Sequence, residues 1–352
     1  MTVRRTLELF GGAGGLAEGF RRAGISFDVT FDFSKDACDS YEQNLRQRPI
    51  QCDVRDLLRL NFAGWSPRDG LDLLTADPPC TPWSRAGKRQ GLADERDMLR
   101  ETAELIRQLK PTAFLIGNIP GLDDSSNTRV VQGVIGALWR DGYAIDYRKL
   151  DAADYGVPQN RVRPFWFGRP RESARLAWPA PTHCNPERLS TIAIAGAELA
   201  PWATCRQALE HVPVEEMGRV IRIRAKARNA HPPSSPDEPA RVLLAEPSRL
   251  DKGGAVLAPW PWPSTVITAD LNGRIPPRGR HGKSRFSQGN AIALSERAAK
   301  ILQGFPESWV FSGATKAARW AQIGTAVPPP LAEALGRSIA RWFAAQGARE
   351  VA

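Results

Sequence analysis

Residues 6–24 have the sequence TLELFGGAGGLAEGFRRAG, and this stretch decides the fold. Its pattern predicts a strand over residues 6–10, a glycine turn over 11–15 and a helix over 16–24 that stops at a glycine. Strand, glycine turn and helix form the nucleotide-binding opening of a doubly wound α/β sheet, because glycines let the backbone approach a ligand at the helix N-terminus. The spacing differs from the GxGxxG of dinucleotide enzymes and from the GxxxxGK[ST] of P-loops, so neither class is expected.

Two further strands are predicted to end in acidic residues. Residues 27–32, FDVTFD, end at Asp32, whose carboxylate can accept hydrogen bonds from both hydroxyls of a ribose, while Phe33 can stack on a purine. Residues 52–54, CDV, place Asp53 at a third strand end, where an acid can reach an adenine amino group. Each aspartate has a second interpretation, as a cap for the helix or turn that follows it.

A candidate nucleophile lies in residues 76–84, ADPPCTPWS. The preceding apolar residues 71–74 predict a short buried strand, and the prolines end that strand and stiffen the loop. Cys80 is then held at the carboxyl end of a strand, where open α/β sheets bind their ligands, and a thiol so placed is a candidate nucleophile. The alternative interpretation is a small buried residue in a proline turn.

The composition is that of a soluble globular protein with a polyanionic partner. The 352 residues suffice for one large and one small domain; 42% of them are hydrophobic and 24% are charged. The net charge of +10 favours nucleic acid as the partner. Five scattered cysteines without CxxC spacing argue against a zinc site or a disulfide framework and fit a reducing cytoplasm. No apolar run reaches the ~20 residues of a membrane span, and the N-terminus has no signal-peptide pattern.

The pattern changes after Arg169. Before it, residues 99–110 predict an amphipathic helix and residues 112–116 a buried strand. Arg161 and Arg163 alternate along a predicted strand, where they can hold a base or a phosphate; the alternative is that both face solvent. After it, prolines are dense and strands are short up to about Asn290. Two basic clusters lie in this region, and phosphate contact is expected for some members, with a solvated surface as the alternative. The clusters are Arg219, Arg222, Arg224, Lys226 and Arg228, and Arg274, Arg278, Arg280, Lys283 and Arg285.

Four motifs, in order and spacing, resemble those of the DNA cytosine-5 methyltransferase family. They are FGGAGG at 10–15, PC at 79–80, QNRVR at 159–163 and GTAVPP at 324–329. The resemblance covers nearly the whole chain except about residues 170–260. It implies a Rossmann-like, S-adenosylmethionine-dependent domain with a smaller DNA-recognition domain rich in strands and loops. The expected boundaries are 1–170 for the catalytic domain, 171–290 for target recognition, and 291–352 for a hinge and a C-terminal helix that returns to the large domain.

The resemblance also implies roles for single residues. Cys80 is expected to add to carbon 6 of a flipped cytosine, which makes carbon 5 nucleophilic. Arg163 matches the arginine that contacts the base carbonyl. No metal site is expected. DNA contacts are expected from Ser84, Arg222, Lys226 and Arg280. Contacts with S-adenosylmethionine or an analogue are expected from Phe10, Gly12, Gly14, Gly15, Asp32, Phe33, Asp53, Val54, Asp77, Pro79, Leu99, Thr325 and Val327.

The sequence departs from the family pattern at three positions. Gly117 stands where the family has a glutamate that binds the target base, and Arg161 matches the partner of that glutamate and would be left without it. Thr81 replaces a glutamine after the nucleophile, and Thr325 replaces an asparagine in the late motif. We expect a glutamate side chain to be accommodated at position 117, and the two threonines to leave room beside the transferred group.

Three functions therefore remain open. The first is DNA cytosine-5 methylation, impaired or altered by Gly117. The second is transfer of a larger group, or action on another pyrimidine, by the same scaffold. The third is a non-catalytic DNA-binding paralogue or partner subunit. For each, the expected partner is double-stranded DNA. We expect a monomer, with a partner subunit as the alternative, and no association with a membrane. We expect the protein in the cytoplasm, associated with the nucleoid, in a prokaryote or as a phage protein.

Overall fold

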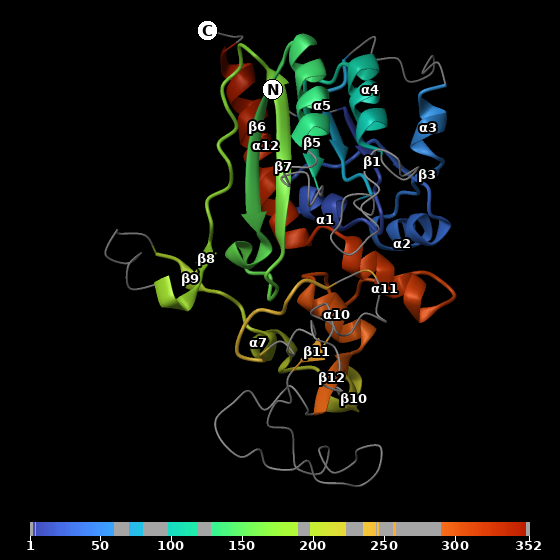
Figure 1. The fold of residues 1–352 in the computed structure, drawn as a ribbon, viewed down its shortest axis with the longest axis vertical. Helices are drawn as coiled ribbons and strands as arrows, with labels where there is room; N and C mark the ends of the chain where they lie inside the picture. Colours follow the sequence, from blue (N-terminus) through green and yellow to red (C-terminus); the bar gives the residue numbers. More distant parts are fainter. Residues whose placement is uncertain are drawn as a thin grey trace.

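The computed structural model describes most of the chain, and a sheet with helices on both faces dominates it (Figure 1). The described residues are 3, 5–59, 70–79, 98–117, 128–188, 198–222, 235–243, 245, 256–257 and 290–349.

The central sheet has seven strands in the order β3–β2–β1–β4–β5–β7–β6. The first five in this order are parallel, and β7 runs antiparallel to both β5 and β6. The order turns back between β1 and β4, so the topological switch point, where such sheets bind ligands, lies between these two strands. The doubly wound α/β class expected from the sequence is thus confirmed. The strands are β1 (Thr6–Leu9), β2 (Val29–Asp32), β3 (Ile50–Gln51), β4 (Leu73–Ala76), β5 (Ala113–Gly117), β6 (Tyr143–Asp151) and β7 (Val162–Pro170).

The strand register brings three distant segments to one edge. Leu9 pairs with Ala76, and Ala76 pairs with Ile116. One position further along each strand come Phe10, Asp77 and Gly117, so these residues are neighbours at the carboxyl edge of the sheet.

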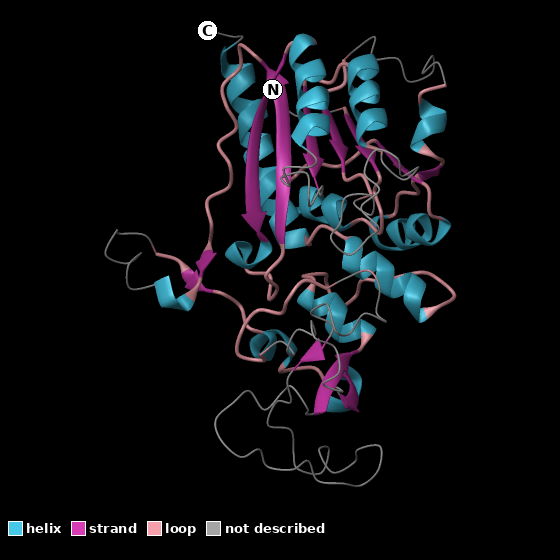
Figure 2. Cartoon of the chain, viewed as in Figure 1, coloured by secondary structure: helices cyan, strands magenta, loops and turns pink. Residues whose placement is uncertain are grey.

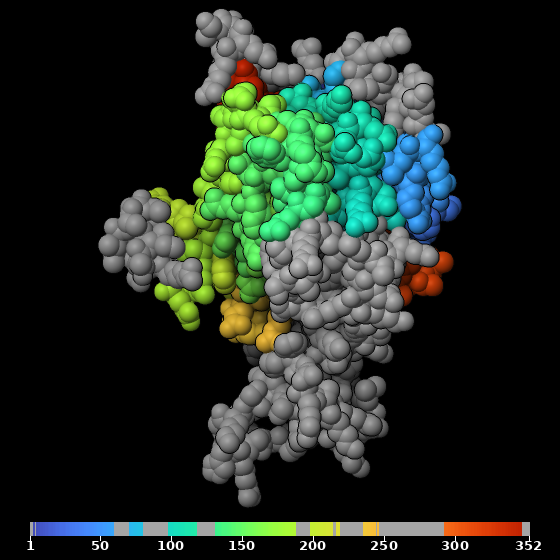
Figure 3. All heavy atoms as spheres, turned by 45° about the horizontal axis from the view of Figure 1, so that its top comes forward, coloured from blue at the N-terminus to red at the C-terminus, as the bar shows by residue number. Residues whose placement is uncertain are grey.

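Two cores cover the two faces of this sheet (Figure 2). Alternate strand residues point to opposite faces, so Leu73 packs in the first core and Leu74 in the second. The first core includes side chains of α1 (Gly15–Arg22), α2 (Lys35–Leu45) and α12 (Pro329–Arg349). The second includes side chains of α3 (Val54–Leu57), α4 (Leu99–Leu109) and α5 (Thr128–Arg140), which follow one another across one face of the molecule (Figure 3).

Helices α1 and α12 approach each other closely because glycines line their contact. A Cβ atom on Gly19 would lie 2.4 Å from the carbonyl oxygen of Pro329 and 2.4 Å from Cβ of Ala332. A Cβ atom on Gly336 would lie 2.8 Å from Cβ of Ala23. The last helix of the chain therefore completes the core that the first helix begins.

A third core joins shorter elements from two parts of the chain, residues 205–243 and residues 292–323. It contains buried residues such as Cys205, Leu243, Ile292 and Trp320. Strand β12 pairs antiparallel with β10 and β11, and β8 pairs with β9. The remaining described elements of the chain are η2 (Ala152–Tyr155), β8 (His183–Cys184), η3 (Pro186–Arg188), β9 (Ala200–Pro201), α7 (Cys205–Leu209), α8 (Val214–Met217), β10 (Gly218–Arg222), β11 (Val256–Leu257), β12 (Asn290–Leu294), α10 (Glu296–Leu302) and α11 (Lys316–Thr325).

Candidate active site

The glycine turn after β1 has an unusual backbone. Phe10, Gly12 and Gly14 have φ angles of 59°, 55° and 88°. A non-glycine residue in the left-handed region is strained, and such strain is concentrated at ligand sites. Among the described atoms, a Cβ atom on Gly12 would meet only the carbonyl oxygen of Phe10, at 4.0 Å. The backbone at Gly12 is therefore accessible to a ligand.

The next two glycines serve packing. A Cβ atom on Gly15 would lie 2.4 Å from the carbonyl oxygen of Val327, and one on Gly14 would lie 2.9 Å from Cδ1 of Leu45. Neither site has room for a side chain. The segment around the buried Val327 therefore lies against the glycine turn.

Asp32 fixes the turn to the end of β2. Its Oδ2 accepts a hydrogen bond of 2.7 Å from the backbone N–H of Gly12, and its Oδ1 accepts one of 2.8 Å from that of Ser34. Burial raises the pKa of Asp32, while these backbone hydrogen bonds act in the opposite direction. The adjacent Phe33 ring is 74% exposed, so its face is available for stacking on a flat ligand.

Asp53 does not end a strand, which corrects the expectation from the sequence. Strand β3 ends at Gln51, and Asp53 is the N-cap of α3, with Oδ1 accepting a hydrogen bond of 2.9 Å from the N–H of Arg55. The Arg55 guanidinium binds the same carboxylate and lowers its pKa. The capping interpretation is therefore the one that the structure bears out, and Val54 beside it is buried.

Asp77 and Arg163 form an ion pair at the end of β4. Nη1 of Arg163 lies 3.0 Å from Oδ2 and 3.2 Å from Oδ1 of Asp77. Nη2 of Arg163 donates to the carbonyl oxygens of Thr325 and Ala326. Burial raises the pKa of the Asp77 carboxyl, while the charge of Arg163 acts in the opposite direction. The pair ties β4 and β7 to the late motif, although the two residues are 86 positions apart.

Gly117 has less room than the sequence suggested. A Cβ atom there would lie 2.9 Å from Cε1 of the buried Phe165 ring and 3.4 Å from Oδ1 of Asp77. A glutamate at this position would push on the ring and would bring a second carboxylate beside the first. A side chain at position 117 therefore requires the Phe165 ring to shift, which argues against the expectation that glutamate is accommodated there.

Arg161 has partners without a glutamate at position 117. Its Nη1 donates to the carbonyl oxygen of Leu243 at 3.1 Å, and its Nη2 donates to that of Gly324 at 2.7 Å. The side chain is buried and links β7 to the third core and to α11. Sequence analysis missed the buried Gln159 in the same motif, whose amide donates to Leu302 O and to Gln303 Oε1.

Other predicted residues have side chains that point away from this cluster or lie outside the described residues. The Thr325 side chain is exposed, and its hydroxyl donates to the Ala321 carbonyl oxygen at 2.9 Å. Pro79 is exposed just beyond β4. Arg222 is the last residue of β10, where only its backbone is described. Cys80, Thr81, Ser84, Lys226 and Arg280 lie outside the described residues.

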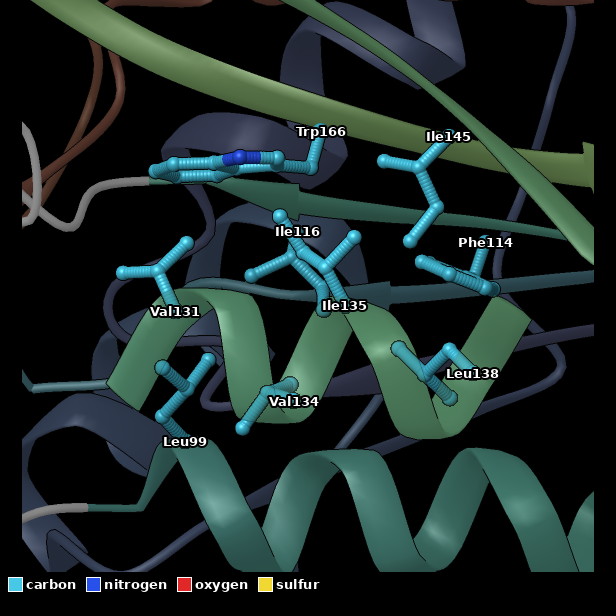
Figure 4. A pocket seen from close by; sticks show the side chains of 9 residues that line it. All are labelled: Leu99, Phe114, Ile116, Val131, Val134, Ile135, Leu138, Ile145 and Trp166. Atoms are coloured by element: carbon cyan, nitrogen blue, oxygen red, sulfur yellow. The ribbon is translucent and has the colours of Figure 1, made fainter. Parts of the chain in front are cut away.

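Leu99 lines an apolar pocket of about 300 Å³, which includes space open to solvent. Figure 4 shows side chains of α5 turned toward Ile116, Phe114 and Trp166 of the sheet. Every lining residue is apolar, whereas small-molecule sites combine apolar walls with a few polar groups that fix orientation. The pocket is therefore a gap in the second core rather than a polar ligand site. The lining residues are Leu99, Phe114, Ile116, Val131, Val134, Ile135, Leu138, Ile145 and Trp166.

The part of the chain that the structure describes contains no group of three or more His, Cys, Asp or Glu residues that could hold a metal ion. Within that same part, no helix is both long and apolar enough to cross a membrane.

Nearly the whole chain is similar to one family of known proteins. The family model for C-5 cytosine-specific DNA methylase matches residues 4–341. The Type II methyltransferase M.NgoMIV of Neisseria gonorrhoeae is 30% identical over 343 residues, covering 95% of this chain and 96% of the relative. M.NaeI of Lentzea aerocolonigenes is 31% identical over 354 residues, covering 96% and 75%.

Solved structures share the fold at low identity. The Dnmt2 methyltransferase of S. pombe aligns with a TM-score of 0.65 at 17% identity, covering 97% of this chain and 99% of that one. The Entamoeba histolytica methyltransferase EhMeth aligns with a TM-score of 0.64 at 16% identity, covering 98% and 99%.

Proposed function

Since this chain belongs to the C-5 cytosine-specific DNA methylase family, and is thus a DNA methyltransferase, we propose that it methylates carbon 5 of cytosine in double-stranded DNA. The nucleophile is Cys80 and the methyl donor is S-adenosylmethionine. One observation carries the proposal most directly. The ends of β1, β4 and β5 bring the glycine turn, Asp77 and Gly117 together at the switch point of the sheet, and Cys80 follows Asp77 by three residues.

The residues at the glycine turn fit the cofactor. Gly12 is accessible, Asp32 keeps carboxylate lone pairs at the end of β2, and the exposed Phe33 ring offers a face to a purine. We assign ribose binding to Asp32 and adenine stacking to Phe33. S-adenosylmethionine supplies an electrophilic methyl group. We assign the neighbouring wall of the site to Val54, which is buried, and to Asp53, the N-cap of α3.

The other cysteines are poorly placed to act as the nucleophile, which supports Cys80; one of them, Cys184, is buried. Burial raises the pKa of Cys38 and Cys52 to about 11 and that of Cys205 to about 12. Only a thiolate attacks a ring carbon, so these three thiols are unreactive near neutral pH. In the proposed reaction, Sγ of Cys80 bonds to carbon 6 of a flipped cytosine, and carbon 5 becomes nucleophilic. Once carbon 5 carries the methyl group, loss of the proton from carbon 5 and elimination of the Cys80 thiolate restore the aromatic ring and the free enzyme.

The proposed test compares the wild type with Cys80→Ala and a control, Cys184→Ala, whose thiol lies in β8. Each protein is incubated with duplex DNA and S-adenosylmethionine, and nucleosides are measured by mass spectrometry. We expect 5-methylcytosine from the wild type and the control and none from Cys80→Ala, with unchanged cofactor binding by calorimetry. Absence of 5-methylcytosine from the folded wild type would reject the proposed function, and methylation by Cys80→Ala would reject the nucleophile.

A further inference from the structure

We propose that Gln159 and Gln303 are positioning residues of the methylation reaction, because their side-chain amides form a relay of hydrogen bonds that holds the Arg163 guanidinium in place. This inference rests on the proposed function and deepens it. The relay runs from the backbone N–H of Leu243 to the carbonyl oxygen of Ala326, which Arg163 also binds. The two glutamines therefore act through Ala326 and Arg163.

Each link of the relay is a direct hydrogen bond between buried groups. The N–H of Leu243 donates to Oε1 of Gln159 at 3.0 Å. Nε2 of Gln159 donates to Oε1 of Gln303 at 2.8 Å and to the carbonyl oxygen of Leu302 at 3.2 Å. Nε2 of Gln303 donates to the carbonyl oxygen of Ala326 at 2.7 Å. Both glutamines are 0% exposed, so the loss of one amide leaves buried polar atoms unpaired.

The two ends of the relay require an amide at both positions. One end is a backbone N–H, which needs an acceptor, and the other end is a carbonyl oxygen, which needs a donor. A glutamine side chain offers one group of each kind. A carboxylate has no donor, a lysine has no acceptor, and an aliphatic side chain has neither. The order of donors and acceptors is therefore fixed along the relay, and a substitution at either glutamine interrupts it.

The relay ends on an atom that anchors Arg163. The Ala326 carbonyl oxygen accepts from Nε2 of Gln303 and, at 3.0 Å, from Nη2 of Arg163, so both of its lone pairs are used. Ala326 is the C-cap of α11, where the backbone leaves the helix, and Gln303 is the C-cap of α10. Nη1 of Arg163 binds Asp77 at the end of β4. Fixing the Ala326 carbonyl therefore fixes a guanidinium at the edge of the sheet where the proposed reaction takes place.

The other end of the relay belongs to the third core. Leu243 is buried there, and its carbonyl oxygen accepts from Nη1 of Arg161 at 3.1 Å while its N–H donates into the relay. The same segment is held by two backbone hydrogen bonds of 2.8 Å, from Asn160 to Ala240 and from Ala240 to Pro158. The relay therefore extends from the third core to the carboxyl edge of the central sheet.

The test measures the single-turnover rate of methylation and the affinity for S-adenosylmethionine. Gln303→Met keeps the length of the side chain but removes the relay, so we expect the rate to fall by roughly 10–10²-fold as Arg163 is displaced. The cofactor affinity should stay close to that of the wild type, because Asp32 holds the glycine turn independently. Gln159→Met should have a similar effect. The double variant should lose no more than either single variant, since one relay is interrupted in all three.

Gln303→Glu gives a readout that a loss of packing would not produce. A protonated glutamate offers an acceptor and an O–H donor in the order that the relay needs, whereas an ionised one offers no donor. Burial and the Asp77 carboxylate favour the protonated form, and Arg161 and Arg163 favour the ionised form. We expect the ratio of the Gln303→Glu rate to the wild-type rate to rise as the pH is lowered from 9 to 6. The corresponding ratio for Gln303→Met should stay constant.

Gln322 of α11 provides the matched control. It is also a buried glutamine, but the described partners of its side chain are Ser40, Ser312 and Ala318 rather than members of the relay. Gln322→Met and Gln322→Glu should lower the stability measured by urea unfolding. The methylation rate of the folded variants, and its dependence on pH, should match those of the wild type.

The outcomes separate this inference from the proposed function. A folded Gln303→Met protein with the wild-type rate overturns the relay, as does a double variant whose loss equals the product of the two single losses. A rate ratio for Gln303→Glu that does not change with pH, or equal losses in the Gln322 variants, also overturns it. Each of these results leaves the proposed function standing if the wild type methylates cytosine. A folded wild type that forms no 5-methylcytosine overturns the proposed function and this inference with it.

Discussion

At the scale of single residues, the space beside β5 is shared by Gly117, Phe165 and Asp77. The Phe165 ring is buried, and its edge already approaches the position of a Cβ atom at residue 117. An added carboxylate would also meet the negative charge of Asp77, and two carboxylates in one site cannot both ionise easily. The identity of residue 117 is therefore coupled to that of residue 77.

Gly117→Glu should lower stability by about 1–3 kcal/mol through overpacking and should not raise cytosine methylation. Urea unfolding and a nucleoside assay measure the two effects. Gly117→Ala adds only the Cβ atom and separates the contact with Phe165 from the charge. The double variant Asp77→Gly/Gly117→Glu removes the repulsion and should methylate faster than Gly117→Glu alone. A single Gly117→Glu variant that exceeds the wild-type rate would contradict this coupling.

Glu8 is a second buried acid, on β1, and it predicts a pH-dependent stability. Burial raises its pKa from 4.5 to about 8, although Tyr41 and Thr30 donate hydrogen bonds to Oε2. Between pH 4.5 and about 8, Glu8 keeps its proton in the folded protein but loses it in the unfolded chain. The stability contribution is therefore fully present below pH 4.5 and is lost as the pH rises through 8, by roughly 1.4 kcal/mol for each pH unit in this window.

Glu8→Gln removes this titration, so its unfolding free energy should depend less on pH between 5.5 and 8.5 than that of the wild type. Urea unfolding at several pH values provides the measurement, and Glu104→Gln, at an exposed ion pair on α4, is the control. Parallel pH profiles for the wild type and Glu8→Gln would show that Glu8 does not titrate in this range.

The residue scale also marks where the sequence was informative. The positions of Asp32 and Phe33 at the end of a strand could be predicted, because a strand and its last residues form a pattern of neighbouring positions in the sequence. The ion pair between Asp77 and Arg163 could not, because it depends on the pairing of β4 with β5 and of β5 with β7. The partners of Arg161 were likewise invisible, since Leu243 and Gly324 lie 82 and 163 positions away.

At the scale of elements, the contact between α1 and α12 depends on the absence of side chains. Gly19→Ala would place Cβ against Pro329, Ala332 and Glu333, all within 2.5 Å, and most of these atoms belong to the backbone. We expect a loss of about 1–3 kcal/mol or more, because the helices must move apart. Thermal or urea unfolding measures it.

A matched glycine lies in α5. A Cβ atom on Gly136 would meet no described atom within 4 Å, so Gly136→Ala should be neutral or stabilise the protein by about 0.5–1 kcal/mol. Equal effects of the two substitutions would mean that α1 and α12 are not held together as closely as their glycines indicate.

Most regular elements could be predicted from local periodicity. The helix expected over 99–110 is α4, and the strand expected over 112–116 is β5 displaced by one residue. The error at Asp53 arose because a two-residue strand and a helix cap have the same sequence pattern. Pairing order and register could not be predicted, since they depend on residues far apart in the chain.

At the scale of the whole molecule, the net charge of +10 predicts DNA binding that weakens with salt. Arg222→Gln, Lys226→Gln and Arg280→Gln should each lower the slope of log affinity against log salt by about one if the residue contacts a phosphate. Fluorescence anisotropy with a duplex measures the slopes. Arg107→Gln is the control, because Arg107 on α4 is paired with Asp141 and Glu104. Unchanged slopes in all three variants would assign these residues to solvated surface.

The closing of the first core by α12 has a consequence for synthesis of the protein. Helix α1 ends at Arg22, and its partner begins at Pro329. At roughly 5–20 residues per second, about 15–60 s separate the appearance of the two helices at the ribosome. During that interval the apolar side of α1 is exposed to other nascent chains and to chaperones. The core that positions the glycine turn is complete only when α12 has emerged, so a chain released before α12 is made cannot form it.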